Sequence, residues 1–346
     1  MARPNVAVVG AGAWGTTLAL QLARTGPVTL LVRDVAAATA LTDAHENVRH
    51  LPGVRLPVEV EASADPADLV DADRLVIVAV PSSGVRSTAE RIGAHLHPAT
   101  VVVSVAKGLE RGSLKRMTEV LAEALPIAES RLAALSGPNL AHEIASGLPA
   151  SAVVASTELT SAQRVLEVLG SRSFRLYTNR DVIGVELCGA LKNIVAIAAG
   201  AAEQLGFGDN GKASLITRGL AEMTRLGVAA GANPLTFAGL AGVGDVVATC
   251  SSPRSRNHRL GEELARGRSW ADIEADLPGV AEGAYTVDAA LGLAERLGVE
   301  LPIAQEVHKA LFEGKSVQRC LIDLLSRESK DELAGLEGRP GPAAVA

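Results

Sequence analysis

The sequence predicts an α/β protein with a doubly wound, mostly parallel sheet in its N-terminal domain and a second, all-helical C-terminal domain. Short β-branched runs alternate with amphipathic segments through the first half, a pattern typical of a parallel sheet covered by helices on both faces. After residue 181 long helical patterns follow, separated by loops rich in Gly and Pro. We expect a first domain over residues 1–181, a helical domain over 182–330 and a disordered tail over 331–346.

Six buried strands are expected in the first domain, because short, continuous apolar runs are typical of the strands of a covered sheet. They are Asn5–Val9, Val28–Val32, Leu75–Val80, Val101–Val105, Leu132–Ser136 and Ser151–Ala155. Amphipathic segments at Thr16–Arg24 and Gly84–Leu96 are expected to be helices of the same domain. The helices expected in the second domain cover residues 182–205, 212–231, 257–267, 284–297 and 302–313.

Composition excludes several classes of protein. The chain is 48% hydrophobic with a net charge of −6, and it has no Lys- or Arg-dense stripe interleaved with aromatics, so no nucleic-acid partner is expected. No apolar run approaches the ~20 residues of a membrane span, so no membrane partner is expected. Three widely spaced cysteines, Cys188, Cys250 and Cys320, favour a reducing cytoplasm and argue against a metal cluster or a disulfide framework.

A glycine motif follows the first predicted strand directly and opens the first predicted helix. In it, Gly10 would allow a tight turn, Gly12 would let the backbone approach a pyrophosphate, and Gly15 would let helix and sheet pack closely. Phosphates are favoured at such a helix start by its free N–H groups and its dipole. The context predicts a Rossmann-like, dinucleotide-binding domain, with an ordinary glycine turn as the alternative.

The end of the second predicted strand indicates which dinucleotide is bound. An acidic residue there holds the ribose hydroxyls of NAD, whereas an arginine accommodates the 2′-phosphate of NADP. Arg33 occupies the strand end, and Asp34 follows it. The sequence therefore favours NADPH, with NADH possible; the alternative is that Arg33 is a solvated surface charge.

Lys107 follows the fourth predicted strand, and Gly137 follows the fifth. The ligand crevice of an open α/β sheet lies at the carboxyl ends of its strands. We therefore expect Lys107 beside the cofactor, the alternative being a solvent-exposed loop lysine.

Lys192 stands out because it lies inside a nearly all-apolar helical pattern, and only 7 of the 33 basic residues are lysines. A buried ammonium is costly unless it is partnered, and lysine, unlike arginine, can give up its proton. Asp245, in an apolar and glycine-flanked setting, is its predicted partner. The alternatives are a lysine whose head reaches solvent and an aspartate that caps a helix.

Ser255, Arg256 and Asn257 precede a helical pattern in the second domain. Ser255 is a good N-cap, and the guanidinium of Arg256 can bind a phosphate through two parallel hydrogen bonds. The triplet predicts an anion site, the alternative being a simple helix cap. The seven histidines show no metal-ligand spacing, and no metal site is expected.

Nine segments in collinear order make the chain resemble the bacterial-type NAD(P)-dependent glycerol-3-phosphate dehydrogenases. They are GAGAWGTTLA, HENVRHLPG, AKGLE, LSGPNLAHE, GALKNIVAIAAG, ITRGLAEM, AGVGD, SRN and VAEG. The resemblance implies the interconversion of dihydroxyacetone phosphate and sn-glycerol 3-phosphate, usually with NADPH as reductant, to supply phospholipid synthesis. It also implies a cytoplasmic homodimer.

The resemblance assigns roles to individual residues, with Lys192 at the position of the catalytic lysine. The predicted substrate-binding residues are Lys107, Gly137, Asn139, Lys192, Asn193, Asp245, Ser255, Arg256 and Asn257. The predicted cofactor-binding residues are Gly10, Gly12, Ala13, Trp14, Gly15, Arg33, His50, Lys107, Ala141, Arg256, Val280 and Glu282. Three positions depart from the family pattern: Asn139 replaces a Ser or Thr, His50 replaces a common Tyr, and Ala13 replaces a frequent Ser.

These residues predict hydride transfer to the ketone carbon, with Lys192 giving a proton to the developing alkoxide and with Lys107 and Asn193 polarising the oxygen. A second hypothesis is a related two-domain dehydrogenase of a 3-hydroxy acid or of ketopantoate. The anion site at Ser255 and the segment Ala106–Glu110 argue against it. A third is a nonenzymatic nucleotide-sensing regulator, which would need an effector module and no buried lysine.

Overall fold

The computed structural model describes residues 5–276, 279–328 and 331. The chain divides into two compact units: unit 1 is Met1–Glu110 with Lys115–Val182, and unit 2 is Arg111–Leu114 with Ile183–Ala346. No sequence pattern predicted that the short segment Arg111–Leu114 belongs to the second unit. Apart from Asp331, the predicted tail lies outside the described residues.

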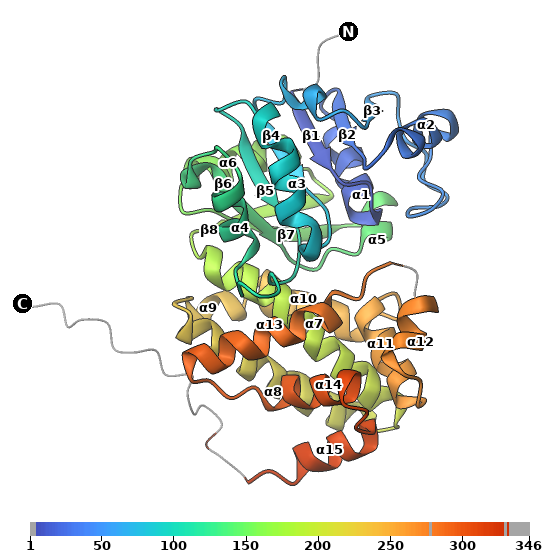
Figure 1. Ribbon diagram of the computed structural model, residues 1–346, viewed down its shortest axis with the longest axis vertical. Coiled ribbons are helices and arrows are strands. Elements are labelled where there is room, and N and C mark those ends of the chain that lie inside the picture. The colour runs from blue at the N-terminus through green and yellow to red at the C-terminus, as the bar shows by residue number, and fades with distance from the viewer. Residues whose placement is uncertain (1–4, 277–278, 329–330, 332–346) are drawn as a thin grey trace, which may run out of the picture. The chain divides into compact units, whose positions relative to one another are not determined.

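Unit 1 is built on an eight-stranded sheet of order β3-β2-β1-β4-β5-β6-β7-β8 (Figure 1). Neighbouring strands are parallel except β6 and β7, which are antiparallel, so the predicted doubly wound, mostly parallel sheet is confirmed. The strands are β1 (Val6–Val9), β2 (Val28–Leu31), β3 (Val60–Ser63), β4 (Leu75–Val78), β5 (Val101–Ser104), β6 (Leu132–Ser136), β7 (Ala150–Ala155) and β8 (Phe174–Asn179). The strand order reverses between β1 and β4, and a ligand crevice of this fold lies at such a reversal.

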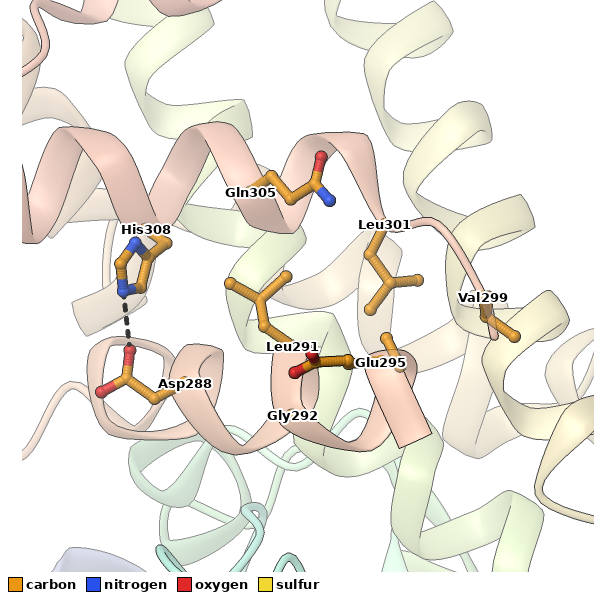
Figure 2. A pocket seen from close by; sticks show the side chains of 9 residues that line it. Asp288, Leu291, Gly292, Glu295, Val299, Leu301, Gln305 and His308 are labelled. Carbon is orange, nitrogen blue, oxygen red and sulfur yellow. Dashed lines mark ion pairs between the residues drawn. The ribbon is translucent and has the colours of Figure 1, made fainter. Parts of the chain in front are cut away.

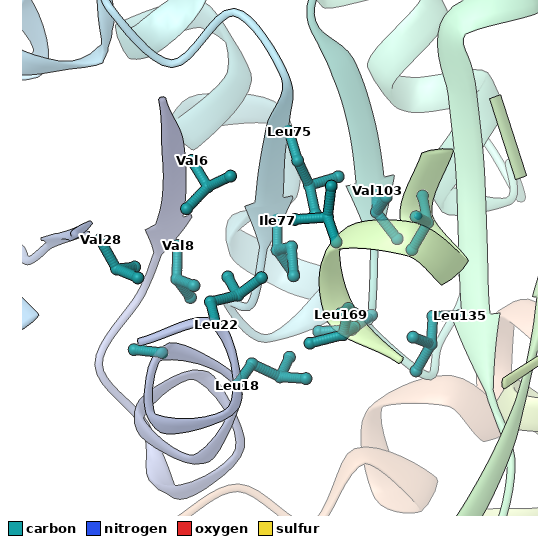
Figure 3. Close-up of a cluster of buried hydrophobic side chains, with 14 of the residues drawn as sticks. Val6, Val8, Leu18, Leu22, Val28, Leu75, Ile77, Val103, Leu135 and Leu169 are labelled. Carbon is teal, nitrogen blue, oxygen red and sulfur yellow. The ribbon is translucent and has the colours of Figure 1, made fainter. Parts of the chain in front are cut away.

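The helices of unit 1 cover both faces of the sheet. One face packs against α1 (Ala13–Leu22), α5 (Ala141–Ala145) and α6 (Leu159–Leu169), and the other against α3 (Val85–Ile92) and α4 (Met117–Ala124). Successive side chains of a strand point to opposite faces, so Val8 joins the first cluster and Val9 the second. Figure 3 shows Leu18 and Leu22 of α1 in the first cluster with Val8 and Ile77. A further helix, α2 (Val35–Ala44), follows β2.

The regular elements of unit 2 are helices, as predicted. They are α7 (Val182–Gln204), α8 (Gly208–Ala229), α9 (Pro234–Phe237), α10 (Asp245–Ser251), α11 (Arg256–Ala265), α12 (Trp270–Asp276), α13 (Glu282–Leu297), α14 (Pro302–Phe312) and α15 (Val317–Leu325), with a π-helical turn at Leu240–Gly244. The chain passes through this turn directly into α10, so the glycines of the Asp245 motif form the turn that precedes its helix.

Among the described residues, two helical stretches are long and apolar enough to cross a membrane, Val182–Gln204 and Pro234–Ser251. The expectation that no apolar segment approaches that length was therefore wrong. Each stretch contains isolated charged residues, which interrupt a continuous apolar run but leave the mean hydropathy high. Within its most apolar window, 89% of α7 is buried inside the protein, against 44% of the second stretch. Burial of that extent is the property of a core helix, since a helix that is apolar all round needs apolar surroundings.

Candidate functional site

The glycine turn of unit 1 combines two crowded positions with one open position. Gly10 has a φ of +109°, and a Cβ added to it would lie 2.7 Å from the Ala79 carbonyl oxygen. A Cβ added to Gly15 would lie 1.9 Å from the Gly10 carbonyl oxygen, whereas one added to Gly12 would have nothing within 4 Å. Gly12 is also the N-cap residue of α1 and offers no side-chain cap. A pyrophosphate therefore fits at Gly12, beside the N–H groups that begin α1.

Asn47 holds this turn in place, and sequence reasoning missed it. Its buried side chain donates to the Ala11 carbonyl oxygen at 2.8 Å and to Thr16 Oγ1 at 2.7 Å. The predicted cofactor residue His50 follows on an exposed turn, where its backbone N–H donates to the Asn47 carbonyl oxygen at 3.2 Å. The segment HENVRHLPG thus contributes a buried amide that rigidifies the glycine turn.

Arg33 and Asp34 lie at the carboxyl end of β2. The Asp34 carboxylate caps α2 by accepting from the Ala37 N–H at 2.9 Å, and it accepts from Arg33 Nε at 3.1 Å. The Ala37 N–H and then the Arg33 guanidinium lower the pKa of Asp34. The Arg33 side chain is 87% exposed. Asp34 is thus engaged within the protein, while Arg33 presents its charge to solvent.

Lys107 links the carboxyl ends of β5 and β6, since its Nζ donates to the Gly137 carbonyl oxygen at 2.9 Å. The side chain is partly buried, so the solvent-exposed alternative is wrong. Asn139 donates to the Ser151 carbonyl oxygen at 3.4 Å. Ala141 begins α5, and its carbonyl oxygen accepts from Thr17 of α1 at 3.2 Å.

Two predicted ligand-binding residues of unit 1 carry buried polar atoms with no hydrogen-bond partner among the described residues. They are Trp14 Nε1, next to the glycine turn, and Asn139 Oδ1, after β6. Buried polar atoms are nearly always satisfied, so such exceptions point to a missing ligand or water. Together with the open space at Gly12, they fit a polar, phosphate-bearing dinucleotide.

In unit 2, Lys192 lies in a buried network with two other side chains. Its Nζ donates to Asp245 Oδ1 at 2.8 Å and to Thr249 Oγ1 at 2.5 Å, and Thr249 Oγ1 donates to the same carboxylate oxygen at 3.1 Å. Lys192 is 6% exposed and Asp245 2%. The predicted pairing is confirmed, and the solvent-reaching lysine is wrong. The helix-capping aspartate is also wrong, because Gly244 is the N-cap of α10.

Thr249 is a further residue that sequence reasoning missed. It lies four residues after Asp245, one turn along α10, so the spacing could have indicated it once Asp245 was placed on a helix. Burial raises the pKa of the adjacent Cys250 thiol to about 12. That thiol is neutral near pH 7, so Lys192 and Asp245 face no competing thiolate from it.

Two asparagine amides connect the lysine helix to α11 and α13. Asn257 Nδ2 donates to Asn193 Oδ1 at 2.9 Å, and Asn257 Oδ1 accepts from the Gly283 N–H at 3.0 Å. A backbone N–H can only donate, so the Asn257 oxygen must face Gly283 and its NH₂ group must face Asn193. The contact with α13 therefore fixes the orientation of both amides.

The start of α11 carries the predicted anion site. Ser255 caps the helix by accepting from the His258 N–H at 3.2 Å. The Arg256 residue is exposed overall, but its guanidinium lies against Gly279, where an added Cβ would be 2.3 Å from Nη1. Burial lowers the pKa of Arg256 and the Glu282 carboxylate raises it; an arginine remains charged at neutral pH. The cap and the anion site are compatible, because the side chain of Ser255 satisfies one N–H of several.

The pocket in Figure 2 lies elsewhere, between α13 and α14, and has a volume of about 600 Å³. It is lined by Asp288, Leu291, Gly292, Ala294, Glu295, Val299, Leu301, Gln305 and His308. His308 Nε2 lies 3.2 Å from Asp288 Oδ1. None of the predicted site residues lines this pocket, so its size does not make it the candidate site.

Unit 1 contains a glycine turn of the dinucleotide-binding type, and unit 2 contains a buried ammonium–carboxylate pair together with the helix start that is predicted to bind an anion. This fold and these sites define a two-domain, dinucleotide-dependent oxidoreductase. The sequence model described as the NAD-dependent glycerol-3-phosphate dehydrogenase N-terminus matches residues 5–162, and that of the C-terminus matches residues 181–322. The chain belongs to this family.

Relatives and solved structures agree with that assignment. Glycerol-3-phosphate dehydrogenase (NAD(P)+) of Chlorobium limicola is 48% identical over 331 residues, covering 95% of this chain and 99% of its own. The Streptomyces griseus protein of the same name is 46% identical, with 95% and 98% covered. A crystal structure of glycerol-3-phosphate dehydrogenase from Coxiella burnetii is 37% identical, with a TM-score of 0.88 over 93% of this chain and 98% of that one. A ketopantoate reductase from Ralstonia eutropha, 18% identical with a TM-score of 0.59, shares the fold alone.

Proposed function

We propose that this chain is an NAD(P)-dependent glycerol-3-phosphate dehydrogenase that interconverts dihydroxyacetone phosphate and sn-glycerol 3-phosphate. The observation that carries the proposal is the buried Lys192, hydrogen-bonded to Asp245 and Thr249 in the unit that also holds the anion-binding start of α11. Membership of the family supports the same conclusion. The product would supply phospholipid synthesis.

The nicotinamide cofactor, when bound, supplies or accepts the hydride. Gly10, Gly12 and Gly15 would hold its pyrophosphate at the start of α1, where the open space at Gly12 leaves the backbone accessible. Arg33 would bind the 2′-phosphate, because its side chain is exposed while Asp34 is engaged in capping α2. We therefore propose a preference for NADPH, with NADH also accepted.

Lys192 would give a proton to the substrate oxygen as the ketone is reduced and take it back in the reverse direction. An ammonium has three N–H donors; Asp245 and Thr249 accept two of them, which leaves one for the substrate. The Asp245 carboxylate offsets part of the cost of burying the ammonium. Thr249 accepts from the lysine and donates to the aspartate, so it fixes the direction in which Lys192 can point.

The substrate phosphate would bind at the start of α11. Arg256 and the free N–H groups of the first helical turn provide fixed positive charge there. The buried amides of Asn193 and Asn257 are oriented by Gly283 and are available to order the neighbouring substrate site. For Lys107, Gly137 and Asn139, a role in substrate binding remains a prediction from the family resemblance.

We further propose that the protein is a cytoplasmic homodimer, on the basis of the same resemblance. Light scattering on the purified chain measures the mass in solution. A value of twice the chain mass is expected, and a monomer at enzymatic concentrations would contradict the assignment.

The assay that tests the function follows the absorbance of NADPH after addition of candidate ketones. Dihydroxyacetone phosphate should be reduced, whereas unphosphorylated dihydroxyacetone and ketopantoate should not, because neither carries the phosphate that Arg256 recognises. Parallel assays with NADH measure the cofactor preference. Faster oxidation with ketopantoate than with dihydroxyacetone phosphate would support the alternative dehydrogenase, and no oxidation with any ketone would support a nonenzymatic protein.

A further inference from the structure

The crossing of α7 and α11 in unit 2 is unusually close. A Cβ added to Gly200 would lie 2.0 Å from the His258 carbonyl oxygen, and one added to Gly261 would lie 1.9 Å from the Ile197 carbonyl oxygen. The two backbones therefore touch at both glycines, and interiors packed in this way resist displacement. Side chains projecting next to the crossing are consequently held at fixed separations.

Three potential metal ligands lie beside this crossing. They are Glu203 in the last turn of α7, and His258 and Glu262, four residues apart on α11. One ligand atom from each lies within 4.8 Å of the others. The His258 side chain is 3% exposed, whereas Glu203 is 48% exposed and Glu262 25%. The histidine is therefore inside the protein, and the two carboxylates lie along a route from solvent.

The hydrogen bonding of His258 leaves one ring nitrogen unsatisfied. Nε2 lies 3.3 Å from Glu203 Oε2, which places the ring hydrogen of a neutral imidazole on Nε2. Nδ1 is buried and has no hydrogen-bond partner among the described residues. It faces Glu262 Oε1 at 3.7 Å, which is too long for a hydrogen bond. A buried lone pair thus faces a carboxylate oxygen, and a cation between them would satisfy both.

The separation of these two atoms suits one metal ion. Zinc binds histidine nitrogen and carboxylate oxygen at about 2.0–2.2 Å, so an ion bound to both would hold them somewhat less than ~4.4 Å apart. The 3.7 Å between Nδ1 and Oε1 lies in that range. Imidazole and carboxylate ligands together suit zinc or manganese better than magnesium, which prefers oxygen ligands and retains its water.

We propose that His258 Nδ1 and Glu262 bind a single divalent transition-metal ion, with Glu203 holding the imidazole in place by accepting from Nε2–H. The bond from Nε2–H to Glu203 would connect the ion's site on α11 to the last turn of α7, and water would complete the coordination. Lys212 Nζ lies 2.5 Å from Glu203 Oε2, and its side chain is 23% exposed, so its positive charge opposes binding of a cation nearby. Because α7 carries Lys192 and α11 begins with the anion site, the ion would stabilise the helix pair that supports both.

The test is a titration of the full-length, untagged, metal-free protein with Zn²⁺ by calorimetry, repeated with Co²⁺ to follow its visible absorption. One site per chain is expected, with a rise in the midpoint of thermal unfolding as the ion binds the native state. Glu262→Gln and His258→Asn should each weaken binding at least about tenfold, equivalent to ~1.4 kcal/mol. Lys212→Met should strengthen it, because a positive charge near the ion is removed.

His308→Asn is the matched control. The two ring nitrogens of His308 also lie near carboxylates, at 3.2 Å from Asp288 and 3.3 Å from Glu313, but the side chain is 29% exposed and so carries no deeply buried lone pair. Zn²⁺ binding should be unchanged in this variant. If His258→Asn does not fold, Glu262→Gln on its partly exposed side chain decides the question by itself.

Two outcomes would overturn the proposal. One is a wild-type protein that binds no Zn²⁺. The other is binding that survives Glu262→Gln and His258→Asn unchanged, which would assign the ion to other side chains. These measurements use neither ketone nor cofactor, so their failure leaves the proposed dehydrogenase activity standing.

Discussion

The candidate ligand sites of the two units are built by opposite means. The turn in unit 1 depends on the absence of side chains. Gly10 and Gly15 allow the backbone to pack closely, and Gly12 leaves open space at the start of a helix. The network in unit 2 works by burying charged side chains, with Lys192 and Asp245 almost inaccessible to solvent. The first arrangement can bind a phosphate without any ionisable group, whereas the second can hold and transfer a proton. Substitutions should therefore affect cofactor affinity in unit 1 and turnover in unit 2.

The largest structural effect is expected within the glycine turn, where two matched substitutions separate packing from binding. Gly15→Ala should destabilise the native state by at least about 3 kcal/mol, because its Cβ would overlap the Gly10 carbonyl oxygen. Gly12→Ala should leave the free energy of unfolding nearly unchanged and weaken cofactor binding, because its methyl group enters only the open space. Urea unfolding and cofactor titration measure the two effects. Equal loss of stability in both variants would contradict this division.

Glu222 of unit 2 is a buried carboxylate to which no ammonium group of the described residues donates a hydrogen bond, in contrast to Asp245. It accepts from the Ile303 N–H at 2.9 Å at the start of α14, and burial raises its pKa to about 7 from 4.5. The native state therefore favours the protonated acid. The stability this provides is complete below about pH 4.5 and is lost as the pH rises through 7.

Glu222→Gln removes that titration. As the pH rises from 5 to 8, the free energy of unfolding of Glu222→Gln should increase relative to that of the wild type. The increase should be up to about 3 kcal/mol, at ~1.4 kcal/mol per pKa unit. Urea unfolding at the two pH values measures the change. Glu306→Gln is the control: the Lys309 and Lys315 ammonium groups outweigh burial and lower the pKa of Glu306, so it does not titrate in this range. If the difference in free energy of unfolding between Glu222→Gln and wild type is the same at both pH values, the prediction is wrong.

Arg256→Ala should specifically weaken the binding of the phosphorylated substrate. The loss of a charged hydrogen-bonding partner is typically ~1.5–3 kcal/mol, so KM for dihydroxyacetone phosphate should rise roughly 10- to 150-fold. Arg259→Ala, an exposed position on the same helix, is the control and should change KM little. Steady-state kinetics distinguish the two, and an unaltered KM in Arg256→Ala would remove the phosphate site from α11.

The smallest effect is expected at Arg33. Arg33→Ala should raise KM for NADPH about fivefold, or ~1 kcal/mol, and leave KM for NADH nearly unchanged, because only NADPH carries the 2′-phosphate. Arg91→Ala, an exposed arginine of α3, serves as the control. If both cofactors lose affinity equally, Arg33 does not distinguish them.

The sequence predicted the interior of the sheet but not its two outer strands. The strands β1, β4, β5 and β6 are short runs of consecutive buried residues, which periodicity detects. β3 and β8 are half-exposed and include polar residues such as Glu61 and Arg175, so their apolar signal is weak. Strands at a sheet edge have one neighbour and fewer buried positions, and their pairing is set by tertiary contacts.

Site residues were predictable where they belong to a short sequence motif or where burying their charge costs free energy. Lys192 stood out because burying an ammonium needs a partner, and the apolar, glycine-flanked setting of Asp245 indicated that partner. Asn47 could not be predicted, because its partners Ala11 and Thr16 lie 36 and 31 residues away in the chain. The segment Arg111–Leu114 was missed for a similar reason: Arg111 pairs with Asp288 at 2.6 Å, 177 residues later. No local pattern encodes such long-range contacts.

The central claim is that Lys192 supplies the proton, and turnover of Lys192→Ala measured beside cofactor binding tests it most directly. Proton transfer by a positioned side chain contributes about 10²–10⁴-fold, so kcat should fall by that factor while NADPH titrates with wild-type affinity. Lys309→Ala on α14 is the control for a lysine bonded to a carboxylate outside the site. Near-normal kcat in Lys192→Ala, with an unchanged pH profile, would contradict the account.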